Sequence, residues 1–162
     1  MEQGQLSSAR VRPAGPAPLH LRAVRERRPG GGGVTVLKAR GTVDASNAAE
    51  FSEALAGHLA EADRAGEPAV LDMAELYLAS AVAVRSLDRA TGGLALAGRC
   101  LPIVQPRPHV REALRMAGLP GVRAHATLTS ALRSLEAEAE AEAEAEAETG
   151  AGRGPGAAPA RG

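Results

Sequence analysis

The sequence is almost without aromatic side chains: its 162 residues include one Tyr, one Phe and no Trp. The hydrophobic fraction of 44% therefore rests on Ala, Val and Leu, and the core has to be aliphatic. Proteins that bind single-stranded nucleic acid without sequence preference stack the bases on aromatic rings. Because such rings are missing, we expect no direct binding of nucleic acid.

Cysteine is equally scarce. Cys100 is the only one, which excludes an intramolecular disulfide and favours a reducing compartment. Its apolar neighbours predict a buried structural thiol.

No stretch approaches the roughly 20 apolar residues of a membrane span, and the N-terminus lacks the continuous apolar segment of a signal peptide. These absences predict a cytoplasmic protein without a membrane span.

The chain carries no net charge, but the balance arises by cancellation between its two ends. Residues 1–30 hold six Arg against two Glu, and residues 136–162 hold two Arg against seven Glu. The centre is nearly neutral, which removes the electrostatic signature of a nucleic-acid-binding domain. Together with the Pro, Gly and Ala content of the ends, this predicts three regions. They are a disordered tail over 1–18, one domain over 19–135, and an acidic Glu/Ala extension with a disordered end over 136–162.

Two hydrophobic periods alternate along the central region. Alternating or continuous apolar runs predict strands over 19–24, 34–40, 69–73, 100–104 and 122–125. Spacings of three and four predict helices over 48–62, 81–94, 108–117 and 128–135, with Asp44 or Ser46 capping the first. The continuous run at 69–73 is typical of a strand covered on both faces. The expected fold is α/β, a four- or five-stranded mixed sheet flanked by about four helices. Beyond Glu136 we expect a fraying helical extension, and disorder from Thr149.

Catalytic and metal-binding patterns are missing. The four His residues are scattered one per element, without a second ligand at the short spacing that usually forms a zinc site. Ser80 lies between Ala79 and Ala81 and lacks the glycine-flanked turn of a hydrolase nucleophile. The glycines at 30–33 are not followed by the Lys and Ser or Thr of a phosphate-binding loop. We expect a binding protein without cofactor or metal, and not an enzyme.

Three polar residues are expected at or near the carboxyl ends of strands, where open α/β sheets usually carry their functional surface. Asp44 follows the second predicted strand, Asp72 lies at the end of the third, and Ser80 begins the helix that follows. Asp and Ser also cap helices irrespective of function, for about 1 kcal/mol each. Both interpretations of Asp44 and Ser80, as caps and as functional groups, remain open at the level of sequence.

The order and spacing of several short motifs resemble the STAS domain family of anti-sigma factor antagonists. These motifs are Gly41-Thr42-Val43-Asp44, Leu71-Asp72-Met73, Leu78-Ala79-Ser80-Ala81-Val82, Ala97-Gly98-Arg99, Val110-Arg111-Glu112-Ala113-Leu114 and Ala117-Gly118-Leu119. The resemblance covers about residues 19–135. It implies a sheet flanked by helices that binds an anti-sigma factor, often a serine-protein kinase of the histidine-kinase ATPase type, and thereby controls release of a sigma factor.

The resemblance also implies a site. Ser80 matches the serine that is phosphorylated in such switches, and Asp44 matches the aspartate of the nearby turn. The docking residues implied are Asp44, Tyr77, Ala79, Ser80, Ala81 and Val82. The usual family pattern around the serine is Asp-Ser-Ser-Gly, and here only the serine is kept. This departure favours an alternative, a STAS-type subunit that binds a transporter ATPase or another signalling assembly without phosphorylation.

Overall fold

The computed structural model describes residues 18–28 and 30–157, with side chains through residue 149. The predicted N-terminal tail, apart from its last residue, and the last five residues of the C-terminal tail lie outside the described residues.

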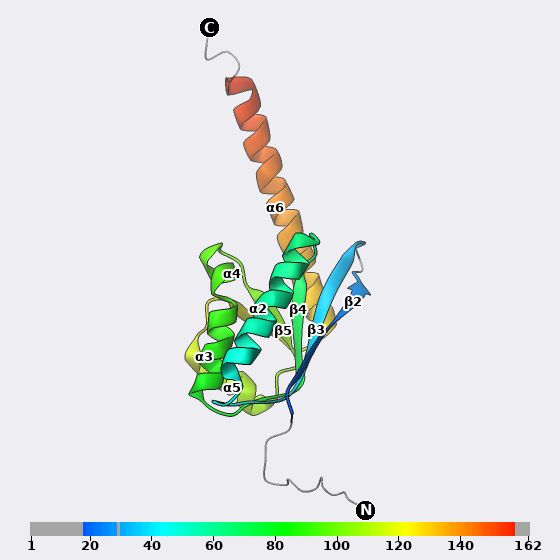
Figure 1. Ribbon diagram of the computed structural model, residues 1–162. Coiled ribbons are helices and arrows are strands. Elements are labelled where there is room, and N and C mark those ends of the chain that lie inside the picture. The colour runs from blue at the N-terminus through cyan, green and yellow to red at the C-terminus, as the bar shows by residue number, and fades with distance from the viewer. Residues whose placement is uncertain (1–17, 29, 158–162) are drawn as a thin grey trace, which may run out of the picture.

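The domain is built on one five-stranded mixed sheet, as predicted (Figure 1). Its strands lie in chain order across the sheet: β2 (His20–Arg27), β3 (Gly33–Val43), β4 (Ala69–Leu78), β5 (Leu101–Val104) and β6 (Val122–His125). The glycine-rich turn makes β2 and β3 an antiparallel hairpin, whereas β3, β4, β5 and β6 run parallel to one another. The carboxyl ends of β3 and β4 therefore meet at the same edge.

The described residues form five helices beside the sheet, where about four were predicted: α2 (Ala48–Arg64), α3 (Ala81–Ala90), α4 (Gly92–Leu96), α5 (Pro108–Ala117) and α6 (Leu128–Ala157). The additional helix arises because the predicted helix over 81–94 is interrupted at Thr91. The Thr91 hydroxyl donates to the carbonyl oxygen of Leu87 at 3.0 Å, and Gly92 and Gly93 follow. A hydroxyl bonded to the preceding turn and two glycines both weaken a continuous helix.

The two faces of the sheet carry different cores. On one face, α2, α3 and α5 bury Phe51, Leu55, Leu87, Val110 and Leu114 against the strands. On the other face, Ala131 and Leu132 of α6 pack on a smaller set of strand residues: Val34, Val36, Val70 and Val104. The aliphatic core expected from the composition is thus confirmed.

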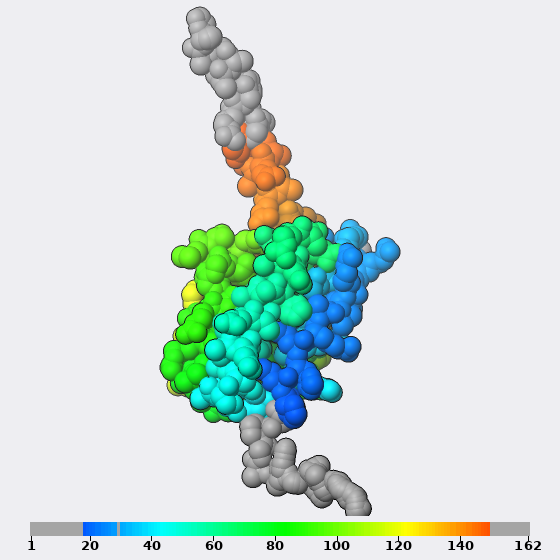
Figure 2. Space-filling view, in the orientation of Figure 1, coloured from blue at the N-terminus to red at the C-terminus, as the bar shows by residue number. Residues whose placement is uncertain are grey.

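α6 covers only part of its face. Along β3, the residues on this face change from buried Val34 and Val36 to exposed Lys38 and Arg40. Residues 137–149 of α6 are all exposed, and beyond Glu138, which pairs with Arg123 of β6 at 3.2 Å, the helix projects from the body of the domain (Figures 1 and 2). The helix reaches Ala157, beyond Thr149, where disorder was expected from the sequence. Within the described part of the chain, no helix is both long and apolar enough to cross a membrane.

β4 is longer than the predicted strand over 69–73, because a bulge interrupts its alternation. Its register with β3 shifts between Lys38 and Arg40, and the Asp72 carboxylate accepts a hydrogen bond from the Ala74 backbone N–H at 3.0 Å. An extra residue in one strand changes which side chains face the core. The prediction that Asp72 ends this strand is wrong, since the strand continues to Leu78 and Asp72 lies in its middle.

Cys100 also departs from the prediction. It precedes β5 and is only partly buried, so it is not the enclosed thiol that its apolar neighbours indicated. Partial burial raises the pKa of this thiol above its ordinary value, which keeps it protonated at neutral pH.

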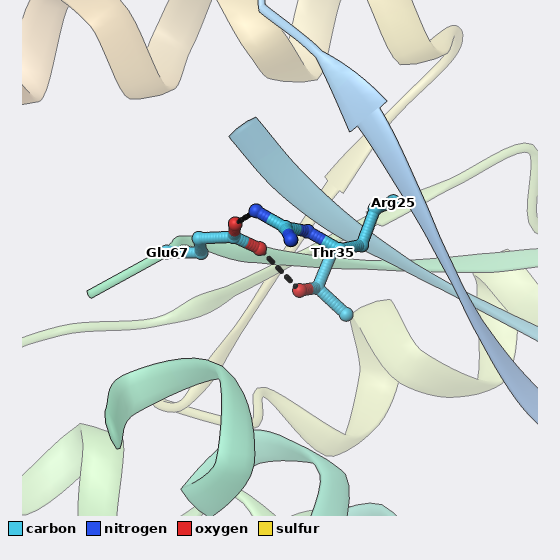
Figure 3. A network of polar contacts seen from close by, with 3 residues as sticks. All are labelled: Arg25, Thr35 and Glu67. Atoms are coloured by element: carbon cyan, nitrogen blue, oxygen red, sulfur yellow. Dashed lines mark hydrogen bonds and ion pairs between the residues drawn. The ribbon is translucent and has the colours of Figure 1, made fainter. Parts of the chain in front are cut away.

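A polar network ties β2 and β3 to the loop that precedes β4 (Figure 3). The side chain of Glu67 is 9% exposed and accepts a hydrogen bond from the Thr35 hydroxyl at 2.9 Å. Its other carboxylate oxygen pairs with the guanidinium of Arg25, which is 75% exposed. The Thr35 bond is the better shielded of the two, because exposed ion pairs are weakened by solvent and salt.

Replacement of Glu67 by Ala is expected to lower the free energy of unfolding by about 1–3 kcal/mol, because it leaves the buried Thr35 hydroxyl without its acceptor. Arg25→Ala should cost at most about 1 kcal/mol, as an exposed partner. Urea unfolding of both variants measures this, with exposed Glu61→Ala on α2 as the control. Equal losses for Glu67→Ala and Glu61→Ala would contradict the role of the network.

Candidate protein-binding surface

The predicted site residues meet at the edge where β3 and β4 end. Val43 and Leu78 are register partners, and the Ala79 backbone N–H donates to the Val43 carbonyl oxygen at 2.9 Å. This bond places the turn that begins at Asp44 beside the segment that leads to Ser80. Parallel pairing thus brings together two segments that are more than 30 residues apart in the sequence.

Asp44 organises the turn between β3 and α2. Its carboxylate accepts hydrogen bonds from the Ser46 backbone N–H at 2.9 Å and from the Ser46 hydroxyl at 2.6 Å. Asn47 closes the turn, since its side chain accepts from the Asp44 N–H and donates to the Thr42 carbonyl oxygen. The helix begins after Asn47, so the prediction that Asp44 or Ser46 caps it is wrong. Asp44 stabilises an Asx-type turn instead.

The hydrogen bonds from Ser46 lower the pKa of Asp44 below its ordinary value. A depressed carboxyl pKa contributes stability above its unfolded-state value of about 4, and this contribution is lost as the pH falls through the lower folded-state value. The free energy of unfolding of Asp44→Asn should therefore lie below that of the wild type at neutral pH, with the gap narrowing under about pH 4. Urea titrations across this pH range measure the difference. In a Ser46→Ala background, the loss in free energy of unfolding caused by Asp44→Asn should be smaller at neutral pH. Parallel profiles at all pH values would refute the assignment.

Ser80 begins α3, as predicted, but its side chain does not cap the helix. Its backbone is extended, with φ −160° and ψ 174°, and its carbonyl oxygen accepts from the N–H groups of Ala83 and Val84. The hydroxyl makes no capping hydrogen bond and the residue is exposed. The first turn of α3 carries no acidic residue. The hydroxyl is therefore accessible at a helix end whose dipole favours negative charge.

Small and apolar residues surround this hydroxyl. Ala79 and Ala81 are exposed, and Val82 is 37% exposed on the first turn of α3. Tyr77, the only tyrosine of the chain, is 42% exposed near the end of β4. The structure therefore places all six predicted docking residues on or next to one edge, and most of them are accessible.

Two residues at this edge were not predicted as site residues. The guanidinium carbon of Arg107 lies 4.3 Å from the centre of the Tyr77 ring, and its Nη1 donates to the Tyr77 hydroxyl at 3.1 Å. His109 stacks on the same ring at 4.8 Å between centroids. The Arg107 guanidinium over the ring is a cation–π contact, and His109 adds a stacking contact to the same ring. The sequence offered one signal, the Pro106-Arg107-Pro108 bracket that stiffens the backbone around Arg107.

No group of three or more His, Cys, Asp and Glu side chains able to hold a metal ion occurs among the described residues. The four histidines lie on separate elements or loops of the described structure. Burial and the nearby charge of Arg123 lower the pKa of His125, which favours its neutral form. The edge consequently offers hydrogen bonding, apolar contact and cationic side chains, which are the means of recognising another protein.

Comparison with known proteins agrees with this architecture. A family model described as "Mlab, STAS domain" matches residues 27–130, which include both turns of the candidate surface. A crystal structure of an anti-sigma factor antagonist from Mycobacterium paratuberculosis is similar in fold, with a TM-score of 0.54 and 22% sequence identity. The similarity covers 72% of this chain and 95% of that one. A search of curated proteins gives no significant match.

Proposed function

Since the chain belongs to the STAS domain family, we propose that it is a regulatory protein that binds an anti-sigma factor and controls release of a sigma factor. The observation that carries the proposal is the accessible edge at the ends of β3 and β4. There an uncapped Ser80 hydroxyl lies among exposed Ala79, Ala81 and Val82. In this proposal the protein acts in the cytoplasm, by binding and not by catalysis, and without a cofactor.

The proposed partner is an anti-sigma factor that is also a serine-protein kinase of the histidine-kinase ATPase type. Phosphorylation of Ser80 adds a charge of about −1.5 to −2 and three acceptor oxygens. The N-terminus of α3 tolerates that charge, because its dipole is favourable and its first turn holds no acid. A partner surface that fits a neutral hydroxyl does not tolerate it, because the charge has to be desolvated. Phosphorylation would then release the partner and leave the fold unchanged.

Intact-mass analysis tests the switch. The full chain is incubated with ATP and each purified serine-kinase anti-sigma factor of its source organism, beside a Ser80→Ala variant. Binding to one of them, a gain of one phosphate by the wild type and none by the variant is the expected result. If the Ser80→Ala variant also gains a phosphate, the phosphorylated residue is not Ser80. Absence of binding to every anti-sigma factor would overturn the proposed function.

A second candidate is a STAS-type subunit that binds a transporter ATPase or another signalling assembly without a phosphorylation cycle. The observation in its favour is the sequence around Ser80, where Ala79 and Val82 replace an aspartate and a glycine of the usual family pattern. Purification of the full chain from its source separates the two candidates, because a transporter partner brings membrane components with it and an anti-sigma factor does not.

A further inference from the structure

A hollow of about 470 Å³ lies beside the candidate surface, between the ends of β2, β3 and β4 and the loop before α5. Tyr77 lines it and also belongs to the predicted docking residues. Four of its lining residues have long polar or charged side chains: His20, Arg40, Glu75 and Arg107. Two permanent cations and a histidine thus face one carboxylate, and the hollow has a net positive charge.

Arg107 is held in place by its backbone neighbours. Pro106 is buried, Pro108 occupies the start of α5, and the backbone of Arg107 is extended with φ −61° and ψ 151°. Gln105, just before them, has a φ of 56°, a left-handed conformation that is rare outside glycine. Strain of this kind persists only where the surrounding structure imposes it. The backbone of Arg107 is therefore pre-organised, and little backbone entropy is lost when it contacts a ligand.

In the part of the chain that the structure describes, the arginines of the hollow have no ion-pair partner. Among residues 18–28 and 30–149, no carboxylate lies within 4.0 Å of the charged nitrogens of Arg40 or Arg107. In that same part of the chain, Nε of Arg107 is buried and has no hydrogen-bond partner. Among the described residues, the one hydrogen bond of its guanidinium goes to the Tyr77 hydroxyl. Apart from the bond to Tyr77, the terminal N–H groups of the Arg107 guanidinium therefore have no hydrogen-bond partner among the described residues.

We propose that this hollow receives an acidic side chain of the protein partner, with its carboxylate between Arg40 and Arg107 and its methylene groups against the Tyr77 ring. The proposal rests on the proposed function and specifies the partner as one that presents Asp or Glu beside the segment docking at Ser80. Arginine is suited to this role, because its planar fork binds a carboxylate through two parallel hydrogen bonds.

The first experiment uses a probe that does not depend on the partner. A labelled twelve-residue peptide of alternating Glu and Gly is titrated into the full chain at low salt, beside its Gln counterpart. We expect the Glu peptide to bind more tightly, and Arg40→Gln and Arg107→Gln each to weaken it about fivefold or more. Arg64→Gln removes the same charge from the far end of α2 and should have little effect. Equal losses of affinity for the Glu peptide in all three variants, or no loss in any of them, would overturn the proposal.

The second experiment uses a purified anti-sigma factor that binds the wild type. Arg107→Gln should raise its Kd about tenfold and flatten the dependence of the association rate on salt, whereas Arg64→Gln should change neither. Arg107→Lys keeps the charge but loses the two parallel donors of the guanidinium, and its Kd should lie between those of the two Gln variants. Unchanged binding by Arg107→Gln would refute the acidic contact and leave the proposed function standing. Failure of every anti-sigma factor to bind would refute the proposed function. The peptide titration would then be the test of whether the hollow binds carboxylates.

Discussion

Replacement of Phe51 by Ala is expected to lower the free energy of unfolding by about 3–5 kcal/mol, the largest change in stability from a single residue of this domain. Phe51 is the only phenylalanine of the chain and is 1% exposed, on the face of α2 that packs on the sheet. Its removal takes away both the transfer energy of the ring and the contacts of the aliphatic residues around it. Domains of this size are stable by only about 5–15 kcal/mol, so the variant should be close to unfolding at 37 °C.

Thermal and urea unfolding measure the effect of Phe51→Ala, with an expected fall in Tm of roughly 10–20 °C. Phe51→Leu keeps most of the apolar volume and should cost about 1–1.5 kcal/mol. Leu96→Ala removes a side chain that is 92% exposed on α4, and should leave the stability nearly unchanged. If Phe51→Ala and Leu96→Ala unfold at the same urea concentration, Phe51 does not lie in the core as described.

The sequence predicted the sheet and most helices, because their hydrophobic periods follow local geometry. Phe51 and Leu55 lie four residues apart on α2, and both are fully buried where that spacing placed them. The prediction for β4 ended too early for a physical reason. At the bulge that follows Asp72, Met73 is buried, and the next buried residue is Leu76, three positions on. The strict period of two is therefore lost at this point.

The candidate site was predictable only in its local part. Asp44 and Ser80 follow strands, and parallel strands end at a common edge, so their proximity follows from topology. Arg107 is thirty residues from Tyr77 in the sequence, and their contact depends on the path of the loop between β5 and α5. A hydrophobic period does not predict such a contact, because it involves a polar side chain from a loop. The Asx turn of Asp44 was missed for a similar reason, since Asp is typical of caps and turns alike.

Val82→Asp is expected to separate binding from folding. Val82 lies in the first turn of α3, where a carboxylate interacts favourably with the helix dipole by about 0.3–1 kcal/mol. Because Val82 is already 37% exposed, its replacement should leave the free energy of unfolding nearly unchanged or slightly raised. At the proposed interface the same carboxylate would be desolvated without a partner, which costs about 3 kcal/mol or more and raises the Kd for the anti-sigma factor at least about a hundredfold.

The matched control is Val82→Thr, which keeps the shape of the side chain and adds no charge. Its Kd should lie within about tenfold of the wild type, since a hydroxyl at a partly exposed position costs little. Calorimetric titration and urea unfolding are carried out on both variants. A loss of binding that is accompanied by an equal loss of stability would assign Val82 to the fold. If Val82→Asp binds as the wild type does, the interface lies elsewhere. If the domain stays stable and no longer binds, the start of α3 is part of the recognition surface.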